Sequence, residues 1–118
     1  MKNLLKKIDI TLEAIPMVIT DLEGEPLSED ENQQPTIYLY GMDSDQFKKA
    51  LRVIEREDDD RDEKLLAHCI KDWKNIYDDN GMEVHYSEEK ALQLIKDYPI
   101  VKTQADRFIA ERANYLKK

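Results

Sequence analysis

Apolar and polar residues alternate at the start of the chain, which predicts a strand. The apolar residues occupy every second position from 8 to 14, namely Ile8, Ile10, Leu12 and Ala14. This is the period of a half-buried strand. Pro16 interrupts it, and residues 17–20 (MVIT) can resume it as a second piece or an edge strand. Residues 36–40 (TIYLY) are rich in strand-forming residues and predict a further strand that ends at Gly41.

The segment between these strands, residues 21–35, predicts a long connection. Its sequence, DLEGEPLSEDENQQP, contains one glycine, two prolines and six acids but no lysine or arginine. Such a composition favours a loop that contributes nothing to the core. We therefore expect a small antiparallel sheet whose strands are joined by an acidic loop.

After Gly41 the spacing of apolar residues changes to that of amphipathic helices. Asp43 or Ser44 can cap the first helix and Ser87 the third. Pro99 can begin the fourth, because the first turn leaves its amide position unpaired in any case. The charged run EREDDDRDE, residues 55–63, separates the first helix from the second. The residues expected to face inward are Phe47, Ala50, Leu51 and Ile54, then Leu66, Cys69, Ile70 and Trp73, then Ala91, Leu92, Leu94 and Ile95, and finally Val101, Ala105, Phe108, Ile109, Arg112 and Leu116.

Together these patterns predict an α+β fold that is predominantly helical, with a small N-terminal antiparallel sheet followed by about four helices. The chain length suits a single domain, residues 1–118, with a strand-rich part at 1–41 and a helical part at 42–118. Arg112 is unusual on an apolar face, and we expect it to pair with an acid such as Asp97 or to lie across Trp73.

Residues 76–94 (IYDDNGMEVHYSEEKALQL) contain acids, an Asn-Gly pair and a histidine, as a chemical site would. A calcium loop with Gly81 at its sixth position would begin at Ile76, which has no side-chain oxygen. It would end at Ser87, where a bidentate glutamate is required. Asn-Gly tolerates the geometry of a tight turn, and strand-forming residues flank it. The pattern favours a short β-hairpin between the second and third helices. The alternative is an irregular acidic loop that binds cations weakly.

The charge balance restricts the classes of partner. The chain has 18 Lys and Arg against 26 Asp and Glu, with a net charge of −8 and a pI near 4.8. Because nucleic acids and anionic lipids both attract clustered positive charge, this composition argues against binding either of them. A single cysteine, Cys69, and the lack of a long apolar run in the sequence favour a cytoplasmic protein. Lys6, Lys7 and Asp9 interrupt the N-terminal residues, so we expect no signal peptide.

We expect no enzymatic chemistry from the sequence. His68, Cys69 and His85 lack the spacing of a metal site or a thiol catalyst, so we expect Cys69 in the core and both histidines on the surface. The run at 55–63 could ligate a cation or imitate a phosphate backbone, but such charge runs favour a solvated connector. The sequence has no nucleophile elbow, phosphate loop, dinucleotide fingerprint or zinc-protease motif. We therefore predict no catalytic residue, no cofactor and no metal.

The C-terminal half carries a series of motifs. In order, they are Trp73, Asp78-Asp79-Asn80-Gly81, Tyr86-Ser87-x-Glu89-x-Ala91-x-x-Leu94, Tyr98-Pro99, Gln104-x-Asp106 and Arg112-Ala113-Asn114-Tyr115-Leu116. This series resembles the tail assembly chaperones of long-tailed bacteriophages, small proteins encoded near the tape measure protein. The resemblance covers residues 65–118, and its most specific parts are the Tyr-Pro break and the ending at 112–116. Members of that family often have a second aromatic residue after Tyr-Pro, where this chain has Ile100.

The resemblance implies a non-enzymatic protein that binds the tape measure protein, helps to recruit tail-tube subunits and self-associates. It also implies a place in the host cytoplasm and absence from the mature virion. Amphipathic helices can share their apolar stripes with a partner helix, and the negative charge would keep the complex dissolved. The candidate partner-binding residues are Tyr98, Ile100, Phe108 and Tyr115. The alternative for each is an ordinary core position, which is the favoured interpretation for Phe108.

Two other functions remain open at this point. An acidic inhibitor or decoy would occupy a basic site on a nucleic-acid enzyme, and it would be a monomer with salt-sensitive binding. A small metal-dependent enzyme would use Asp78, Asp79 and His85, and metal would shift its melting temperature. A chaperone would instead self-associate and bind through apolar surface, which salt weakens little.

Overall fold

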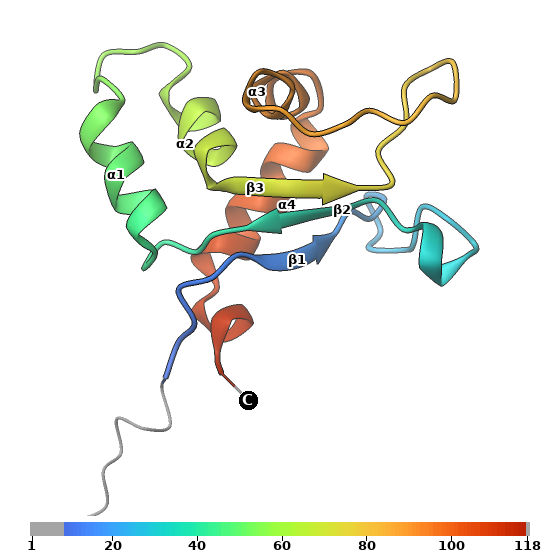
Figure 1. Ribbon diagram of the computed structural model, residues 1–118, viewed down its shortest axis with the longest axis horizontal. Helices are drawn as coiled ribbons and strands as arrows, with labels where there is room; N and C mark the ends of the chain where they lie inside the picture. The colour runs from blue at the N-terminus through green and yellow to red at the C-terminus, as the bar shows by residue number, and fades with distance from the viewer. Residues whose placement is uncertain (1–8, 118) are drawn as a thin grey trace, which may run out of the picture.

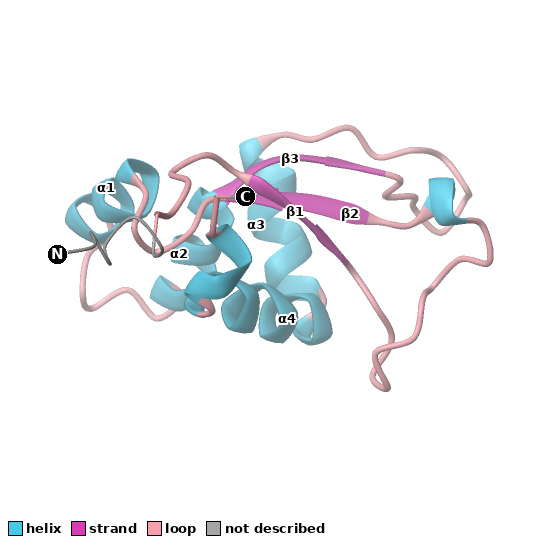
Figure 2. Cartoon of the chain, turned by 90° about the horizontal axis from the view of Figure 1, so that it is seen from below, coloured by secondary structure: helices cyan, strands magenta, loops and turns pink. Residues whose placement is uncertain are grey.

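The computed structural model describes residues 9–117, and its α+β architecture confirms the predicted fold class. The elements are β1 (Ile15–Val18), the 3₁₀ turn η2 (Glu31–Gln33), β2 (Thr36–Leu39), α1 (Asp45–Val53), α2 (Arg61–Cys69), β3 (Ile70–Lys74), α3 (Glu88–Asp97), α4 (Pro99–Ala110) and the 3₁₀ turn η3 (Arg112–Tyr115). Figures 1 and 2 show two layers, with α3 and α4 lying across one face of a three-stranded sheet. α1 packs on α2 at the edge of the helical layer. No helix among the described residues is long and apolar enough to cross a membrane.

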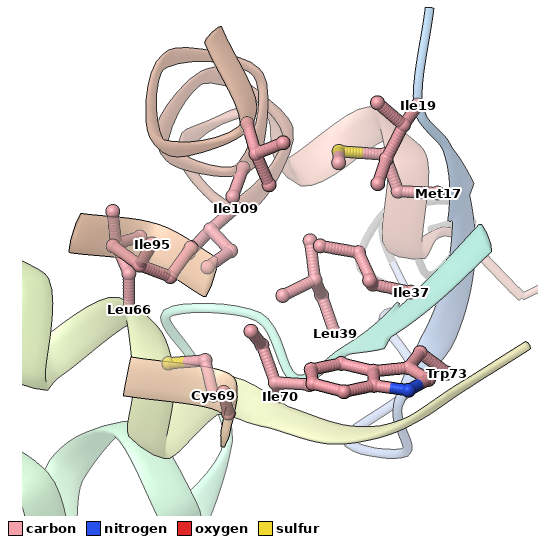
Figure 3. Close-up of a cluster of buried hydrophobic side chains, with 13 residues drawn as sticks. Met17, Ile19, Ile37, Leu39, Leu66, Cys69, Ile70, Trp73, Ile95 and Ile109 are labelled. Atoms are coloured by element: carbon pink, nitrogen blue, oxygen red, sulfur yellow. The ribbon is translucent and has the colours of Figure 1, made fainter. Parts of the chain in front are cut away.

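The antiparallel sheet has the strand order β1-β2-β3. Met17, Ile37 and Trp73 lie opposite one another across the three strands, and all three belong to the core. β3 comes from the part of the chain that was expected to be helical, so the parts 1–41 and 42–118 share one sheet. The helices complete the core with Leu66, Cys69, Ala91, Ile95, Val101, Ala105 and Ile109, several of which are labelled in Figure 3.

The first strand begins later than the alternating pattern predicts. Ile8 lies outside the described residues, and Ile10 makes only an isolated bridge with Leu116. Leu12 is 52% exposed, so the alternation does not face the core. The strand is β1 instead, and it contains Pro16. Proline is tolerated there because β1 is an edge strand, one side of which needs no ladder hydrogen bonds.

Trp73 lies on a strand, and its assignment to the second helix was wrong. That helix, α2, ends just before Ile70, which begins β3. The ladder between β2 and β3 shifts at Tyr38 and Leu39, which leaves Lys71 as the extra residue. Such a bulge lets Ile70 and Trp73 both reach the core although two residues separate them. The spacing of Ile70 and Trp73 therefore matched that of a helix, and the sequence pattern did not predict the third strand.

The predicted turn at Asn80-Gly81 is present, in a hairpin reduced to a single bridge between Tyr77 and Glu83. Gly81 donates its amide hydrogen to the Asp78 carbonyl at 3.0 Å. Its φ of 77° is one that glycine adopts without a steric penalty. The Asp78 carboxylate accepts the amide hydrogen of Asn80 at 2.9 Å. The acid at this corner therefore stabilises the turn.

The residues after this turn cover the outer edge of β3. The Tyr86 hydroxyl donates to the Ile70 carbonyl at 2.9 Å, and the Trp73 indole N–H donates to the Val84 carbonyl at 2.7 Å. The rings of Trp73 and Tyr86 meet edge to face, with centroids 5.4 Å apart. An uncovered strand edge presents unpaired backbone groups to other chains, and here the Tyr86 hydroxyl occupies one of them, the Ile70 carbonyl.

The predicted helix starts are confirmed. Ser44 and Ser87 each accept an amide hydrogen from the first turn of α1 and α3, at 3.2 and 3.1 Å. Pro99 is the first residue of α4. Leu51 was expected to face inward but is 43% exposed, because α1 lies at the edge of the helical layer.

The last helix, α4, is shorter than predicted. Leu116 lies beyond it and is 42% exposed. Arg112 lies on η3 and pairs with Asp43, with Nε 2.8 Å from Oδ2 and Nη2 3.2 Å from Oδ1. The expected partners, Asp97 and Trp73, are not the ones used. The hydrogen bonds from Arg112 lower the pKa of Asp43.

One glutamine side chain joins α4 to the chain just after β1. Gln104 Nε2 donates to the Thr20 carbonyl at 2.9 Å, and Gln104 Oε1 accepts the Thr20 amide hydrogen at 3.0 Å. We expect Gln104→Ala to lower the free energy of unfolding by about 1–3 kcal/mol, because both backbone groups of Thr20 lose their partner. Urea unfolding followed by circular dichroism measures this change.

The matched control for this variant is Gln93→Ala. Gln93 is exposed on α3, and its side chain bonds to the exposed carboxylate of Asp97. Its replacement is expected to change the free energy of unfolding by less than about 0.5 kcal/mol. Equal effects of the two variants would contradict a structural role for Gln104.

Candidate functional site

An apolar groove at one end of the sheet is the strongest candidate for a functional site. Its volume is about 610 Å³. Three segments form its walls: the acidic loop before β2, the residues that follow β3, and the turn between α3 and α4. The first two of these segments gather on the right-hand side of Figures 1 and 2. The apolar residues that line the groove include Leu27, Pro35, Ile76, Tyr77, Leu94 and Tyr98.

Asn75 holds two of these walls together. Its side-chain Nδ2 donates to the carbonyls of Asn32 and Gln34, at 3.2 and 3.0 Å. Its backbone has a φ of 61°, in the left-handed region, which asparagine tolerates better than most residues. The turn of the chain at Asn75 therefore leads Ile76 and Tyr77 into the groove, while its side chain anchors the acidic loop beside them.

The acidic loop, residues 21–35, forms a wall of the groove through its own hydrogen bonds. The Asp21 carboxylate accepts the amide hydrogens of Glu23 and Glu25, both at 2.9 Å. Asp30 caps η2 by accepting an amide hydrogen from Asn32 at 2.9 Å. The loop assignment made from the sequence is confirmed, and these Asx-type turns give the loop a defined path.

Three large apolar side chains of the groove are exposed. Leu27 is 54% exposed, Tyr77 49% and Tyr98 52%. Single exposed apolar residues are ordinary on a protein surface, but a cluster of them in a concave site is typical of a contact surface. Tyrosine adds to this, because its ring is apolar and its hydroxyl can remain hydrated at the edge of a contact.

Two of the three segments that form the groove are rich in acidic residues. Residues 21–35 and 75–83 together hold nine acids and no lysine or arginine, and we call these nine acids the acidic rim. Glu29 follows the lining residue Ser28, and Asp78 follows Tyr77; both acids are exposed. The groove therefore combines apolar walls with acids in two of its wall segments, a combination that matches a segment with both apolar and basic residues.

The four residues predicted to bind a partner do not lie together. Tyr98 lines the groove and is exposed. Ile100 and Phe108 are partly buried and pack against the core. Tyr115 is only 2% exposed, so its side chain belongs to the interior rather than to a contact surface. Among these four residues, Tyr98 alone lines the groove.

The residues considered for metal or enzyme chemistry do not line the groove. Asp78 stabilises its turn, and His85 Nδ1 lies 3.7 Å from a carboxylate oxygen of Glu83, on an exposed surface. Among residues 9–117, no three His, Cys, Asp or Glu side chains gather as metal ligands would. His68 is exposed, whereas Cys69 is buried, and burial raises the pKa of its thiol to about 12. A thiol with that pKa is not a nucleophile at neutral pH.

The acidic run at 55–63 is tied to neighbouring helices. Lys64 pairs with Asp58 at 3.1 Å and with Asp60 at 3.2 Å. Lys96 of α3 pairs with Asp60 at 2.7 Å, and this hydrogen bond is the main cause that lowers the pKa of Asp60. These lysines compensate part of the charge, so the run is a poor imitation of a phosphate backbone.

Sequence reasoning missed most of the groove. Leu27 was counted with a loop that adds nothing to the core, and Tyr77 was assigned to the flank of a hairpin. The available signal was weak: a leucine inside an acidic, proline-containing segment and an asparagine directly after a strand. The groove forms only when these distant segments come together in the fold, and no local sequence pattern predicts that contact.

A comparison with known families places the chain. The family model of the YdaY prophage protein matches residues 26–118. No curated protein and no solved structure matches the chain. The matched residues include β2, all the helices described above and every residue that lines the groove except Ile19. Because the match covers most of its length, the chain belongs to the YdaY prophage protein family.

Proposed function

We propose that this prophage protein is a non-enzymatic tail assembly chaperone, which binds the tape measure protein and associates with further copies of itself. The observation that carries the proposal is the groove, where three exposed apolar side chains meet. One of them is Tyr98, from the Tyr-Pro break that gives the sequence its resemblance to such chaperones. Membership in a prophage family supports the same setting. The chaperone acts in the host cytoplasm and is absent from the mature virion.

The groove suits a protein segment that must be kept from aggregating. An amphipathic helix of the tape measure protein would place its apolar side chains between Tyr77 and Tyr98, which removes apolar surface of both proteins from water. The acidic rim stays in solvent around this contact, and its charge opposes aggregation of the complex. Neither the binding of the helix nor the protection from aggregation requires a covalent bond to be made or broken.

Replacing Tyr98 with aspartate tests this proposal. We expect Tyr98→Asp to reduce capture of the tape measure protein by about tenfold or more, because an exposed aromatic anchor in a contact contributes about 2 kcal/mol. The measurement is co-purification of the two proteins after co-expression, with the tape measure protein of the same prophage as the captured protein.

The matched control is Leu51→Asp. Leu51 is also an exposed apolar residue, at 43%, but it lies on α1, away from the groove. The Leu51→Asp variant should capture the tape measure protein as well as the unmodified chain does, and circular dichroism should show that both variants are folded. If the unmodified chain captures no tape measure protein, or if both variants lose capture equally, the proposal fails.

An acidic decoy for a basic protein is the second candidate, and the acidic rim is the observation that favours it. The two functions differ in their response to salt. Binding through charge alone weakens steeply as salt shortens the range of electrostatic attraction. Capture through the apolar walls of the groove should persist at about 0.5 M salt, where the Debye length falls to roughly 4 Å.

A further inference from the structure

The groove also bears on how copies of this chain associate. A contact surface with apolar walls and the acidic rim is complementary to a short segment with apolar and basic residues and no acids. Such a segment occurs in the chain itself. Residues 1–8, MKNLLKKI, contain three lysines and four apolar residues, and they contain no acid.

The described chain begins, at Asp9, away from the groove of its own molecule. Asp9 and Thr11 are bound to the C-terminal end, with hydrogen bonds from the Lys117 amide to the Asp9 carbonyl at 2.9 Å and from the Thr11 amide to the Tyr115 carbonyl at 2.7 Å. Figures 1 and 2 show this end of the described chain on the left of the molecule, and the acidic loop and the residues after β3, which form two walls of the groove, on the right. A second copy can present its residues 1–8 to the groove without doubling back across the sheet.

We propose that residues 1–8 of one copy dock in the groove of a second copy. The lysines lie against the acidic rim, and the apolar residues lie between the walls that carry Leu27, Tyr77 and Tyr98. Each copy then offers one segment and one groove, so the contact is head-to-tail and builds a ring or an open chain. The inference rests on the proposed function in one respect: the tape measure protein would bind the same groove, and the two occupants would exclude each other.

A short segment suits this exchange. Eight residues bury little surface, so the contact between copies is weak and readily displaced. Self-association therefore covers the apolar walls while no partner is present, and a longer partner segment displaces residues 1–8. The same contact thus explains why exposed apolar side chains need not cause aggregation.

Three full-length charge variants test the contact. The segment variant carries Lys2→Glu, Lys6→Glu and Lys7→Glu. The control variant carries Lys48→Glu, Lys49→Glu and Lys90→Glu, which are exposed lysines of α1 and α3. The rim variant carries Glu25→Lys, Glu29→Lys and Glu31→Lys, which are exposed acids of the loop. Because the segment and control variants have the same net charge, any difference between them reports the position of the charge.

Light scattering over a concentration series measures the mass of each variant. We expect the unmodified chain and the control variant to grow in mass with concentration. We expect the segment variant and the rim variant, each alone, to need at least about tenfold higher concentration for the same mass. Combining the segment and rim substitutions in one chain should restore association, because the charges are then exchanged and complementary again.

The outcomes separate this inference from the proposed function. A monomer at every concentration, or equal association of the segment and control variants, would overturn docking of residues 1–8. The segment variant leaves the groove free, so it should capture the tape measure protein at least as well as the unmodified chain. If association follows the charge exchange while no variant captures that protein, the contact between copies stands and the chaperone proposal fails.

Discussion

Tyr115→Ala is expected to lower the free energy of unfolding by about 3–5 kcal/mol, because it empties a large buried site. The Tyr115 side chain is only 2% exposed, and its hydroxyl donates to the Leu39 carbonyl of the central strand at 3.0 Å. Its ring meets Phe108 edge to face, with centroids 5.8 Å apart. A Cβ atom added to Gly41 would lie 3.1 Å from the same ring. The Tyr115 side chain thus holds the C-terminal turn η3 to the central strand of the sheet.

Two further variants make this prediction specific. Tyr115→Phe keeps the ring but leaves the Leu39 carbonyl without its donor, so we expect a smaller loss of about 1–3 kcal/mol. Tyr77→Ala removes a tyrosine that is 49% exposed, and it should change stability by less than about 0.5 kcal/mol. Urea unfolding followed by circular dichroism compares all three. If Tyr115→Ala costs no more than Tyr77→Ala, the ring is not part of the core.

The features that the sequence predicted well are those determined by neighbouring residues. Ser44 and Ser87 begin helices because a hydroxyl can accept an amide hydrogen from the following turn. Pro99 begins α4, and Gly81 turns the chain, for reasons that lie in their own backbone geometry. Each of these signals operates within a few residues, so it can be recognised without knowledge of the fold.

The features that were missed depend on pairing between distant segments. The bulge opposite Tyr38 and Leu39 gave Ile70 and Trp73 a helical spacing in a strand. The alternation at 8–14 had the period of a strand but no neighbouring strand to complete it: Ile10 found only the single bridge with Leu116. Periodicity reports which residues can share a face, whereas the sheet register decides which face is buried.

The motifs behind the resemblance also divide in two. The side chains of Gln104 and Tyr115 hold the fold together through hydrogen bonds with the backbone of Thr20 and Leu39. Tyr98, by contrast, is exposed in the groove. A motif therefore identified important positions without telling structural residues from contact residues. Burial and hydrogen-bond partners supplied that distinction.

Trp73→Ala is the other substitution from which we expect a large effect. Trp73 is 7% exposed, and it lies on the edge strand β3 at the end of a row that crosses all three strands, opposite Ile37. Its indole N–H donates to the Val84 carbonyl, and its ring packs against Tyr86. The variant loses the core contacts and the cover of the β3 edge together, so we expect a loss of about 3–5 kcal/mol in the free energy of unfolding.

Circular dichroism must follow the unfolding of this variant, because Trp73 is the only tryptophan of the chain and its fluorescence is lost. Trp73→Phe is the informative comparison: it keeps an aromatic ring in the core but not the bond to Val84, and it should cost about 1–3 kcal/mol. The control is Met82→Ala, in the hairpin turn that Gly81 forms. Met82 is 66% exposed, and its replacement should lower the free energy of unfolding by less than about 0.5 kcal/mol. Because Asn75 directly follows β3 and leads into the groove, Trp73→Ala should also weaken capture of the tape measure protein. Full capture by a destabilised Trp73→Ala protein would show that the groove does not depend on the end of this strand.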